Sequence, residues 1–248
     1  MWPYPKVLAH RGGGTLAPEN TLAAFRCGLE YGFHAVEFDV MLSKDGIPVV
    51  IHDPEFGRTV AGRGSVAQTA YADLQKLDAG GWFGQRFAGE PIPAYTDVVA
   101  FCRQHQIWMN VEIKPAPGVE EDTGRVVGAL TERLFADLAV IDYAHLPLFS
   151  SFSFPALMAA KQAAPTIPRG FLMDSITPDW KACLQEAGAR ALHTNHKYLT
   201  PELAAVIKDA GYGLFCYTVN TPERAHEILQ WGVDGFCTDR IDLIPPDF

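Results

Sequence analysis

The chain has 248 residues, of which 48% are hydrophobic, and this suits a single (β/α)8 barrel with a large core, a fold that typically has about 250 residues. The formal net charge is −9, which makes the chain a poor ligand for nucleic acid, because nucleic-acid binding requires clustered lysine and arginine. An anionic substrate would therefore be attracted locally, by a few cations or by a metal.

Short β-like runs alternate with amphipathic stretches along most of the chain. Alternation of this kind produces a parallel sheet covered by helices, and eight repeats indicate a closed barrel. The eight parallel strands are predicted at Lys6–Ala9, Ala35–Val40, Trp108–Ile113, Leu148–Ser151, Arg169–Met173, Ala191–Thr194, Gly213–Val219 and Gly235–Thr238.

Several helix boundaries can be recognised from capping residues. Asn20 or Thr21 is expected to cap a helix that runs to Tyr31. Thr200 and Thr221 are each followed by proline and glutamate, which is typical of an N-cap, the first helical position and a first-turn acid. These signals place helices between the predicted strands.

A ninth strand, Pro48–His52, follows the second parallel strand too closely for a parallel crossover. Asp45 and Gly46 lie between the two strands, and Asp-Gly flanked by β runs predicts a two-residue hairpin loop. With this loop, the antiparallel register places Asp39 directly opposite His52. Residues directly opposite one another point to the same face, so we expect these two side chains to be neighbours.

Residues 54–92 interrupt the repeat and are rich in glycine and aromatic residues. The segment is too long for a plain connection. We interpret it as a small subdomain inserted over the barrel mouth of a single domain that spans residues 1–248. The alternative is a loop that covers one barrel end without a role in substrate binding.

Ionisable side chains stand at the ends of four strand patterns, and the catalytic groups of a barrel lie at the C-terminal ends of its strands. One such group is unremarkable by itself, but four together indicate a single site assembled from several strands. The four groups are His10-Arg11, Glu37-Phe38-Asp39, His52-Asp53 and Glu112-Ile113-Lys114.

Three carboxylates are predicted to converge inside the barrel. Glu37 and Asp39 are two residues apart and share one face of a strand, and Glu112 repeats this placement on another strand. Such carboxylates repel one another unless they take up protons or bind a cation, and oxygen ligands favour one Mg²⁺ or Ca²⁺ ion. The alternative is that they form salt bridges with Arg11 and Lys114.

His10 and His52 differ from the other histidines because each ends a strand beside a charged residue. Two positioned histidines suit general acid–base catalysis, in which one takes a proton and the other delivers a proton to a leaving alcohol. Arg11 offers a fork and Lys114 a point charge for phosphate oxygens. Residues 193–197 and 217–220 either line the mouth or cap helices.

Five cysteines without a CxxC pair indicate reduced core residues in a reducing compartment. The N-terminal sequence has no apolar signal region, and no apolar run approaches the length of a membrane helix. We therefore expect a cytoplasmic protein with no stable membrane association.

The motifs in their order along the chain resemble those of the glycerophosphodiester phosphodiesterases. The resemblance runs from about residue 6 to the C-terminus, and the compact length and the opening Trp2-Pro3-Tyr4-Pro5 are most similar to the cytoplasmic enzyme of enteric bacteria. The matching segments are His10-Arg11-Gly12-Gly13, Pro18-Glu19-Asn20-Thr21, Glu37-Phe38-Asp39-Val40, Ser43-Lys44-Asp45-Gly46, His52-Asp53, Val111-Glu112-Ile113-Lys114, Tyr217-Thr218-Val219-Asn220 and Gly232-Val233-Asp234-Gly235.

This resemblance implies a TIM barrel like that of phosphoinositide-specific phospholipase C, and an enzyme of glycerol and lipid metabolism. The enzyme would hydrolyse glycerophosphodiesters, such as glycerophosphocholine or glycerophosphoethanolamine, to sn-glycerol 3-phosphate and an alcohol. The implied roles are metal ligation by Glu37, Asp39 and Glu112, acid–base catalysis by His10 and His52, and substrate contact by Arg11, Lys114 and Tyr217.

Tyr217 departs from the tryptophan that is frequent at this position of the family, so packing around the substrate is expected to differ. The sequence leaves open whether the protein is a monomer or a homodimer. Two other functions remain as alternatives. One is a lipid phosphodiesterase of the sphingomyelinase D or phosphoinositide type, and the other is a phosphate-ester binding module without catalysis.

Overall fold

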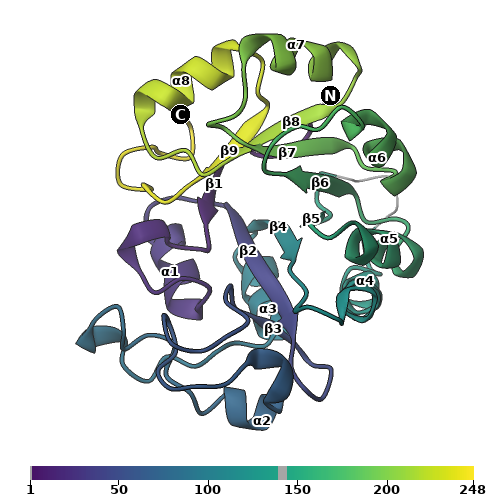
Figure 1. Ribbon diagram of the computed structural model, residues 1–248. Coiled ribbons are helices and arrows are strands. Elements are labelled where there is room, and N and C mark those ends of the chain that lie inside the picture. Colours follow the sequence, from purple (N-terminus) through teal and green to yellow (C-terminus); the bar gives the residue numbers. More distant parts are fainter. Residues whose placement is uncertain (1, 139–143) are drawn as a thin grey trace.

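The strands of the computed structural model, which describes residues 2–138 and 144–248, form a closed barrel (Figure 1). Eight parallel strands follow one another around the wall, and β1 pairs with β2 to complete the ring. They are β1 Val7–His10, β2 Ala35–Leu42, β4 Trp108–Ile113, β5 Leu148–Ser151, β6 Arg169–Met173, β7 Ala191–Asn195, β8 Gly213–Tyr217 and β9 Gly235–Thr238. The predicted (β/α)8 TIM barrel is confirmed.

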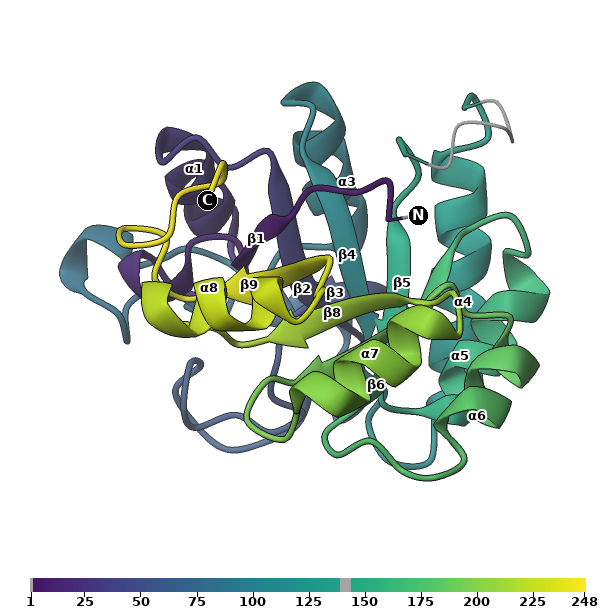
Figure 2. The same ribbon diagram turned by 90° about the horizontal axis from the view of Figure 1, so that it is seen from above.

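Helices cover the outside of this ring (Figures 1 and 2). Thr21, Thr200 and Thr221 each accept a hydrogen bond from a backbone N–H in the first turn of the following helix, which confirms the predicted caps. The helices are α1 Leu22–Glu30, α2 Tyr71–Leu74, α3 Tyr95–Gln104, α4 Glu120–Leu134, α5 Phe154–Ala163, α6 Trp180–Ala187, α7 Pro201–Asp209 and α8 Pro222–Gln230.

The two faces of the barrel wall have different surroundings. On β2, the side chains of Val36, Phe38 and Val40 turn outward and belong to the main apolar cluster, which includes the inner faces of the helices. A second apolar cluster fills the barrel interior at the N-terminal ends of the strands, where Trp2 and Tyr4 pack against it.

Strand β3 (Pro48–Val50) pairs antiparallel with β2, but the register differs by one residue from the predicted register. Asp39 lies opposite Ile51, whose backbone N–H donates to the Asp39 carbonyl oxygen at 3.1 Å. The prediction that Asp39 pairs with His52 is therefore wrong. His52 lies beyond the end of β3, and irregular chain rather than strand register determines its position.

The register differs because the hairpin loop contains three residues instead of two. The backbone N–H of Ser43 donates to the carbonyl oxygen of Ile47, so these two residues face each other across the loop. Gly46 has a φ of +76°, which is the left-handed conformation that closes a three-residue hairpin loop. The Asp-Gly signal therefore identified the hairpin correctly but not the length of its loop.

Replacing Gly46 with alanine is expected to lower the free energy of unfolding by about 1 kcal/mol, because a side chain disfavours the left-handed conformation. A Cβ atom at this position meets no heavy atom within 4 Å, so the loss is due to the backbone alone. Urea unfolding measures the change. Gly84→Ala is a matched control because Gly84 has an equally open environment and an extended φ of 162°, and an equal loss in both variants would contradict the explanation.

Residues 54–92 contain α2 and two short 3-10 helices, η2 (Val66–Gln68) and η3 (Gln85–Phe87), and lie beside the hairpin. Their buried apolar residues form a cluster with the hairpin residues Met41, Val49 and Ile51. This cluster attaches the segment to the strand pair that leads to His52. The division into one barrel domain with an inserted subdomain stays a prediction.

Candidate active site

A cavity of about 140 Å³ lies at the C-terminal ends of the barrel strands. Seven of the eight predicted site residues line it, and these are His10, Arg11, Glu37, His52, Glu112, Lys114 and Tyr217. The eighth, Asp39, is 1% exposed and forms ion pairs with two lining residues, Arg11 and Lys114. The barrel thus brings together residues that are up to 227 positions apart in the chain, from His10 to Cys237 (237 − 10 = 227).

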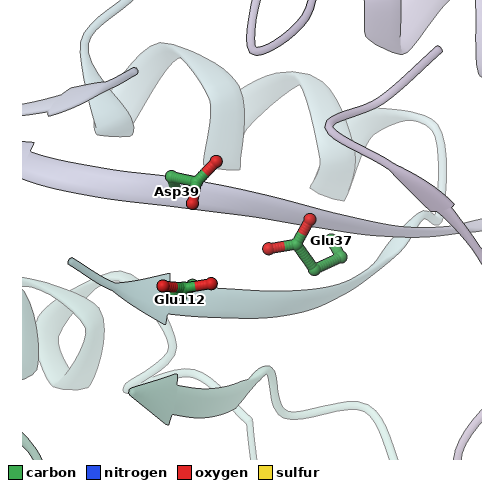
Figure 3. Close-up of side chains that lie close together, drawn as sticks. All are labelled: Glu37, Asp39 and Glu112. Carbon is green, nitrogen blue, oxygen red and sulfur yellow. The ribbon is translucent and has the colours of Figure 1, made fainter. Parts of the chain in front are cut away.

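Three carboxylates meet in the wall of this cavity. Glu37 and Asp39 project from β2, Glu112 projects from the neighbouring β4, and the three side chains point toward one another (Figure 3). Asp39 and Glu112 are direct partners in the parallel register of these strands. One carboxylate oxygen from each residue lies within 4.8 Å of the others, and all three residues are buried.

The pKa values of the three carboxylates shift in different directions. Burial, followed by the charge of Asp39, raises the pKa of Glu37 and of Glu112. Burial also acts to raise the pKa of Asp39, but the charges of Lys114 and Arg11 outweigh it, so this pKa lies below its usual range. Full ionisation of the triad therefore requires additional positive charge in the cavity.

The geometry and donor chemistry of the triad fit a hard divalent cation. Mg²⁺ and Ca²⁺ bind oxygen ligands at roughly 2.0–2.6 Å, so ligand oxygens of one ion are up to about 5 Å apart. The separations of at most 4.8 Å satisfy this limit, and all three donors are carboxylate oxygens. Glu37, Asp39 and Glu112 are thus a possible site for such an ion.

Salt bridges alone explain only one member of the triad. Asp39 lies 3.6 Å from Arg11 Nε and 3.4 Å from Lys114 Nζ. Among residues 2–138 and 144–248, no arginine or lysine forms an ion pair with Glu37 or Glu112. The alternative that the carboxylates serve as structural ion-pair partners therefore accounts for Asp39, whereas the two glutamates have no arginine or lysine as a direct ion-pair partner in the described part of the chain.

Asn20 fixes the orientation of Asp39, which sequence reasoning did not anticipate. Its side-chain amide donates to Asp39 Oδ2 at 2.8 Å, and its amide oxygen accepts from the Asp39 backbone N–H at 3.3 Å. Both Asn20 and Arg11 have positive φ angles, of 60° and 53°, at the loop that follows β1. Backbone strain of this kind is common at functional sites, where the surroundings enforce it.

Each histidine in the cavity is held by an aspartate. His10 Nδ1 lies 2.5 Å from Asp239 Oδ1, and His52 Nδ1 lies 2.6 Å from Asp53 Oδ1. Hydrogen bonds lower the pKa of both aspartates despite their burial, so both carboxylates are ionised. Because an ionised carboxylate can only accept a hydrogen bond, each histidine carries a proton on Nδ1. The Nε2 atom of each neutral ring is then an available proton acceptor.

Asp239 was missed by sequence reasoning although a signal for it was present. It follows β9 directly, so it satisfies the same criterion of an ionisable residue at a strand end that identified the other groups. Asn220 donates to its second oxygen at 2.9 Å and thereby fixes the carboxylate. Asp234, in the motif that was recognised in this region, precedes β9 and lies at the opposite end of the strand.

His52 experiences opposing influences on its protonation. Burial is the largest and lowers its pKa, whereas Asp39 and the hydrogen bond to Asp53 act to raise it. The charges of Arg11 and Lys114 add to the lowering, and the net shift is downward. The protonated ring is therefore favoured by the carboxylates around it and disfavoured by the cations.

Tyr217 occupies the rim of the cavity rather than its centre. Its hydroxyl group donates to Asp174 at 3.5 Å, and its ring packs edge-on against Phe152 with centroids 5.7 Å apart. Asn195 also donates to Asp174, and His196 accepts from Arg224. Both segments left open by the sequence thus reach the cavity, 217–220 through Tyr217 and Thr218 and 193–197 through His193, while Asn195 and His196 are engaged by neighbouring side chains.

His193 lies deep in the barrel and reaches the floor of the cavity. Its ring packs against Phe215, and a Cβ atom on Gly170 would approach His193 Nε2 to 2.4 Å, so glycine is required beneath it. Neither ring nitrogen has a hydrogen-bond partner among the residues that the structure describes. Burial lowers the pKa of His193 to about 3, so the ring is neutral in the folded protein.

This buried histidine predicts a loss of stability in acid. Below pH 6.5 the unfolded chain binds a proton at His193 that the folded protein does not, so stability is retained above this pH and falls as the pH decreases toward 3. Between pH 7 and pH 5, the neutral His193 should lower the free energy of unfolding by about 2 kcal/mol. Urea unfolding of His193→Gln should show a correspondingly weaker pH dependence. An unchanged dependence would contradict this, and substitution of the exposed His34 is the control.

Comparisons with known proteins agree with the geometry. Residues 10–243 match the model of the glycerophosphoryl diester phosphodiesterase family. A curated glycerophosphodiester phosphodiesterase from Caldanaerobacter subterraneus is 37% identical over 238 residues, which are 94% of this chain and 93% of the relative. These matches span nearly the whole chain.

Solved structures resemble the same extent of the chain. A phosphodiesterase from Oleispira antarctica, in complex with the product sn-glycerol-3-phosphate, is 35% identical, with a TM-score of 0.88 over 98% of this chain and 94% of that chain. A glycerophosphodiester phosphodiesterase from Agrobacterium tumefaciens is 28% identical, with a TM-score of 0.77 over 96% of this chain and 97% of that chain.

Proposed function

We propose that this chain, which belongs to the glycerophosphoryl diester phosphodiesterase family, hydrolyses glycerophosphodiesters to sn-glycerol 3-phosphate and an alcohol. The observation that carries the proposal is one cavity that combines three buried carboxylates with two aspartate-held histidines. The relative from Oleispira antarctica holds sn-glycerol-3-phosphate, which is the product expected here. Glycerophosphocholine and glycerophosphoethanolamine are the first substrates to examine.

Substrate binding depends on the cations at the cavity wall. Arg11 and Lys114 both line the cavity, and each already faces Asp39, so they stay ordered beside a buried charge. Their N–H groups can donate to the phosphodiester oxygens and neutralise the charge that develops there. Tyr217 is proposed as a contact to the substrate at the rim.

A divalent cation bound by Glu37, Asp39 and Glu112 would act as a Lewis acid for the phosphodiester and help to orient it. The triad fits Mg²⁺ and Ca²⁺ equally by donor type. Bound positive charge would also relieve the repulsion that raises the pKa values of the two glutamates.

Proton transfer is assigned to the two histidines. His10 is proposed as the base, with Nε2 accepting a proton either from the glycerol 2-hydroxyl, which would then form a cyclic phosphate, or from water. His52 is proposed as the acid, which in its doubly protonated form transfers the Nε2 proton to the departing alcohol and returns to the neutral ring. Asp239 and Asp53 keep both rings oriented and stabilise their protonated forms.

The direct test is product release from several glycerophosphodiesters after chelation, with and without added Mg²⁺ or Ca²⁺. Formation of sn-glycerol 3-phosphate that depends on the ion is the expected result. Binding without turnover would support the phosphate-ester binding module instead, and the sequence relatives do not favour that function.

The alternative of a lipid phosphodiesterase is also not favoured by these relatives. Within residues 2–138 and 144–248, no helix combines the length and apolar character required to cross a membrane. Sedimentation with phospholipid vesicles provides the test, and we propose that the chain remains in the supernatant. The proposed location is the cytoplasm, with a small molecule as its main partner.

A further inference from the structure

Arg58 belongs to the segment 54–92, outside the four strand-end groups, yet it contacts the carboxylates that support two of them. Its Nη1 and Nη2 atoms donate to the two oxygens of Glu19 at 2.6 and 2.7 Å. Its Nε atom donates to Asp53 Oδ2 at 2.6 Å. One guanidinium group therefore bridges two carboxylates that lie 34 positions apart in the chain (53 − 19 = 34).

Both carboxylates continue to groups that line the cavity. Glu19 Oε1 accepts from Arg11 Nη1 at 2.7 Å, and Asp53 Oδ1 accepts from His52 Nδ1 at 2.6 Å. The side chains form a continuous series that runs Arg11, Glu19, Arg58, Asp53, His52. Arg58 is the central member and the only one of the five that does not lie in a motif identified from the sequence.

The packing around Arg58 explains why a partly exposed side chain can hold a fixed position between Glu19 and Asp53. Its side chain is 46% exposed, but the next two residues, Thr59 and Val60, are buried. Val60 belongs to the apolar cluster that joins the segment to the hairpin, and an antiparallel bridge between Glu55 and Ser65 closes the loop around it. The backbone position of Arg58 is thus set by the packed residues that follow it and by the bridge that closes the loop.

The geometry of the contacts requires an arginine. The planar guanidinium binds Glu19 with two parallel N–H groups and uses a third N–H for Asp53. A lysine ammonium is a single point charge on a flexible stem and cannot reproduce this fork.

We propose that Arg58 is a positioning residue for the reaction, which holds the orientations of His52, through Asp53, and of Arg11, through Glu19. This inference rests on the proposed function of the cavity. It gives the segment 54–92 a part in catalysis, which the alternative of a plain covering loop does not. Arg58 acts only through these two carboxylates and makes no contact with the reacting atoms in this assignment.

The test measures kcat and KM for glycerophosphocholine hydrolysis by Arg58→Ala, Arg58→Lys and the control Arg63→Ala, which removes an exposed arginine of the same segment. Displacement of catalytic groups by about 1 Å can reduce turnover by about 100-fold, so we expect kcat of Arg58→Ala to fall roughly 10- to 100-fold. Arg58→Lys should remain impaired, and Arg63→Ala should resemble the wild type.

Two further readouts separate positioning from a structural role. Guanidinium ion added at millimolar concentration should restore part of the kcat of Arg58→Ala and none of the activity of a His52→Ala variant. The NMR signal of the His52 Nδ1 proton should shift in Arg58→Ala and stay in place in Arg63→Ala. A melting temperature close to that of the wild type should accompany both effects.

The outcomes distinguish this inference from the proposed function. A wild-type protein that hydrolyses no glycerophosphodiester refutes the proposed function, and the NMR signal then still tests the contact from Arg58 to His52. An active wild type with kcat of Arg58→Ala within twofold overturns the positioning role. Loss of folding in both Arg58 variants, or loss of kcat that guanidinium does not restore at all, assigns Arg58 to structure and also overturns it.

Discussion

Replacing His52 with alanine is expected to lower kcat for glycerophosphocholine by about 10²- to 10⁴-fold, because a positioned general acid contributes a factor of this size. On a substrate with a nitrophenyl leaving group, the kcat of His52→Ala should fall much less, since nitrophenolate departs without protonation. His10→Ala should be impaired on both substrates, because the base is required whatever group leaves. Steady-state kinetics of the two variants on the two substrates give the four values needed.

The structure explains why this experiment is necessary. Both histidines have the same arrangement, with Nδ1 bound to an aspartate, so geometry alone does not separate acid from base. If the nitrophenyl substrate rescues His10→Ala instead, the two roles are exchanged. Equal losses on both substrates in both variants would remove the acid–base assignment. Substitution of the exposed His226 is the matched control.

Removal of the metal is expected to abolish turnover, and replacement of Glu112 by glutamine is expected to weaken metal binding. The metal-free variant should be more stable than the metal-free wild type, because one of three mutually repelling buried carboxylates is neutralised. At an ion concentration of 100 times the dissociation constant, the free energy of unfolding of the wild type should rise by about 2.7 kcal/mol. The variant should gain less, so the order of stability reverses.

Thermal unfolding with and without Mg²⁺ or Ca²⁺, together with calorimetric titration, measures these effects independently of activity. Glu37→Gln is a second test of the same triad. Asp174→Asn is the control, because Asp174 is an exposed carboxylate beside the cavity and not a member of the triad. Full activity in the presence of a chelator would refute a metal-dependent mechanism.

The relation between the hairpin and His52 illustrates a limit of sequence reasoning. A correct observation, Asp45-Gly46 between two strands, led to a wrong register because the loop uses three residues. His52 nevertheless reaches the cavity, since the chain leaves the strand before it. Register errors of one residue invert every side chain in a strand, whereas residues beyond the strand are placed by tertiary contacts.

The residues that support the site were harder to predict than the residues that form it. Asp239 binds His10 through one side-chain hydrogen bond, and Asn20 binds Asp39 through two hydrogen bonds of its side-chain amide. Such contacts have no periodicity and no fixed spacing in the sequence. Arg58 is a further example, because an arginine in an irregular segment has no local property that distinguishes it from Arg63.

The sequence by itself determined the barrel and seven of the residues that line the cavity. Strand periodicity, capping threonines and ionisable residues at strand ends are local properties, and parallel strands of a barrel necessarily bring their C-terminal ends together. Only the tertiary structure decided the hairpin register, the aspartate behind each histidine and the bridge through Arg58. These depend on loop conformation and on the packing of distant segments, which local sequence patterns do not encode.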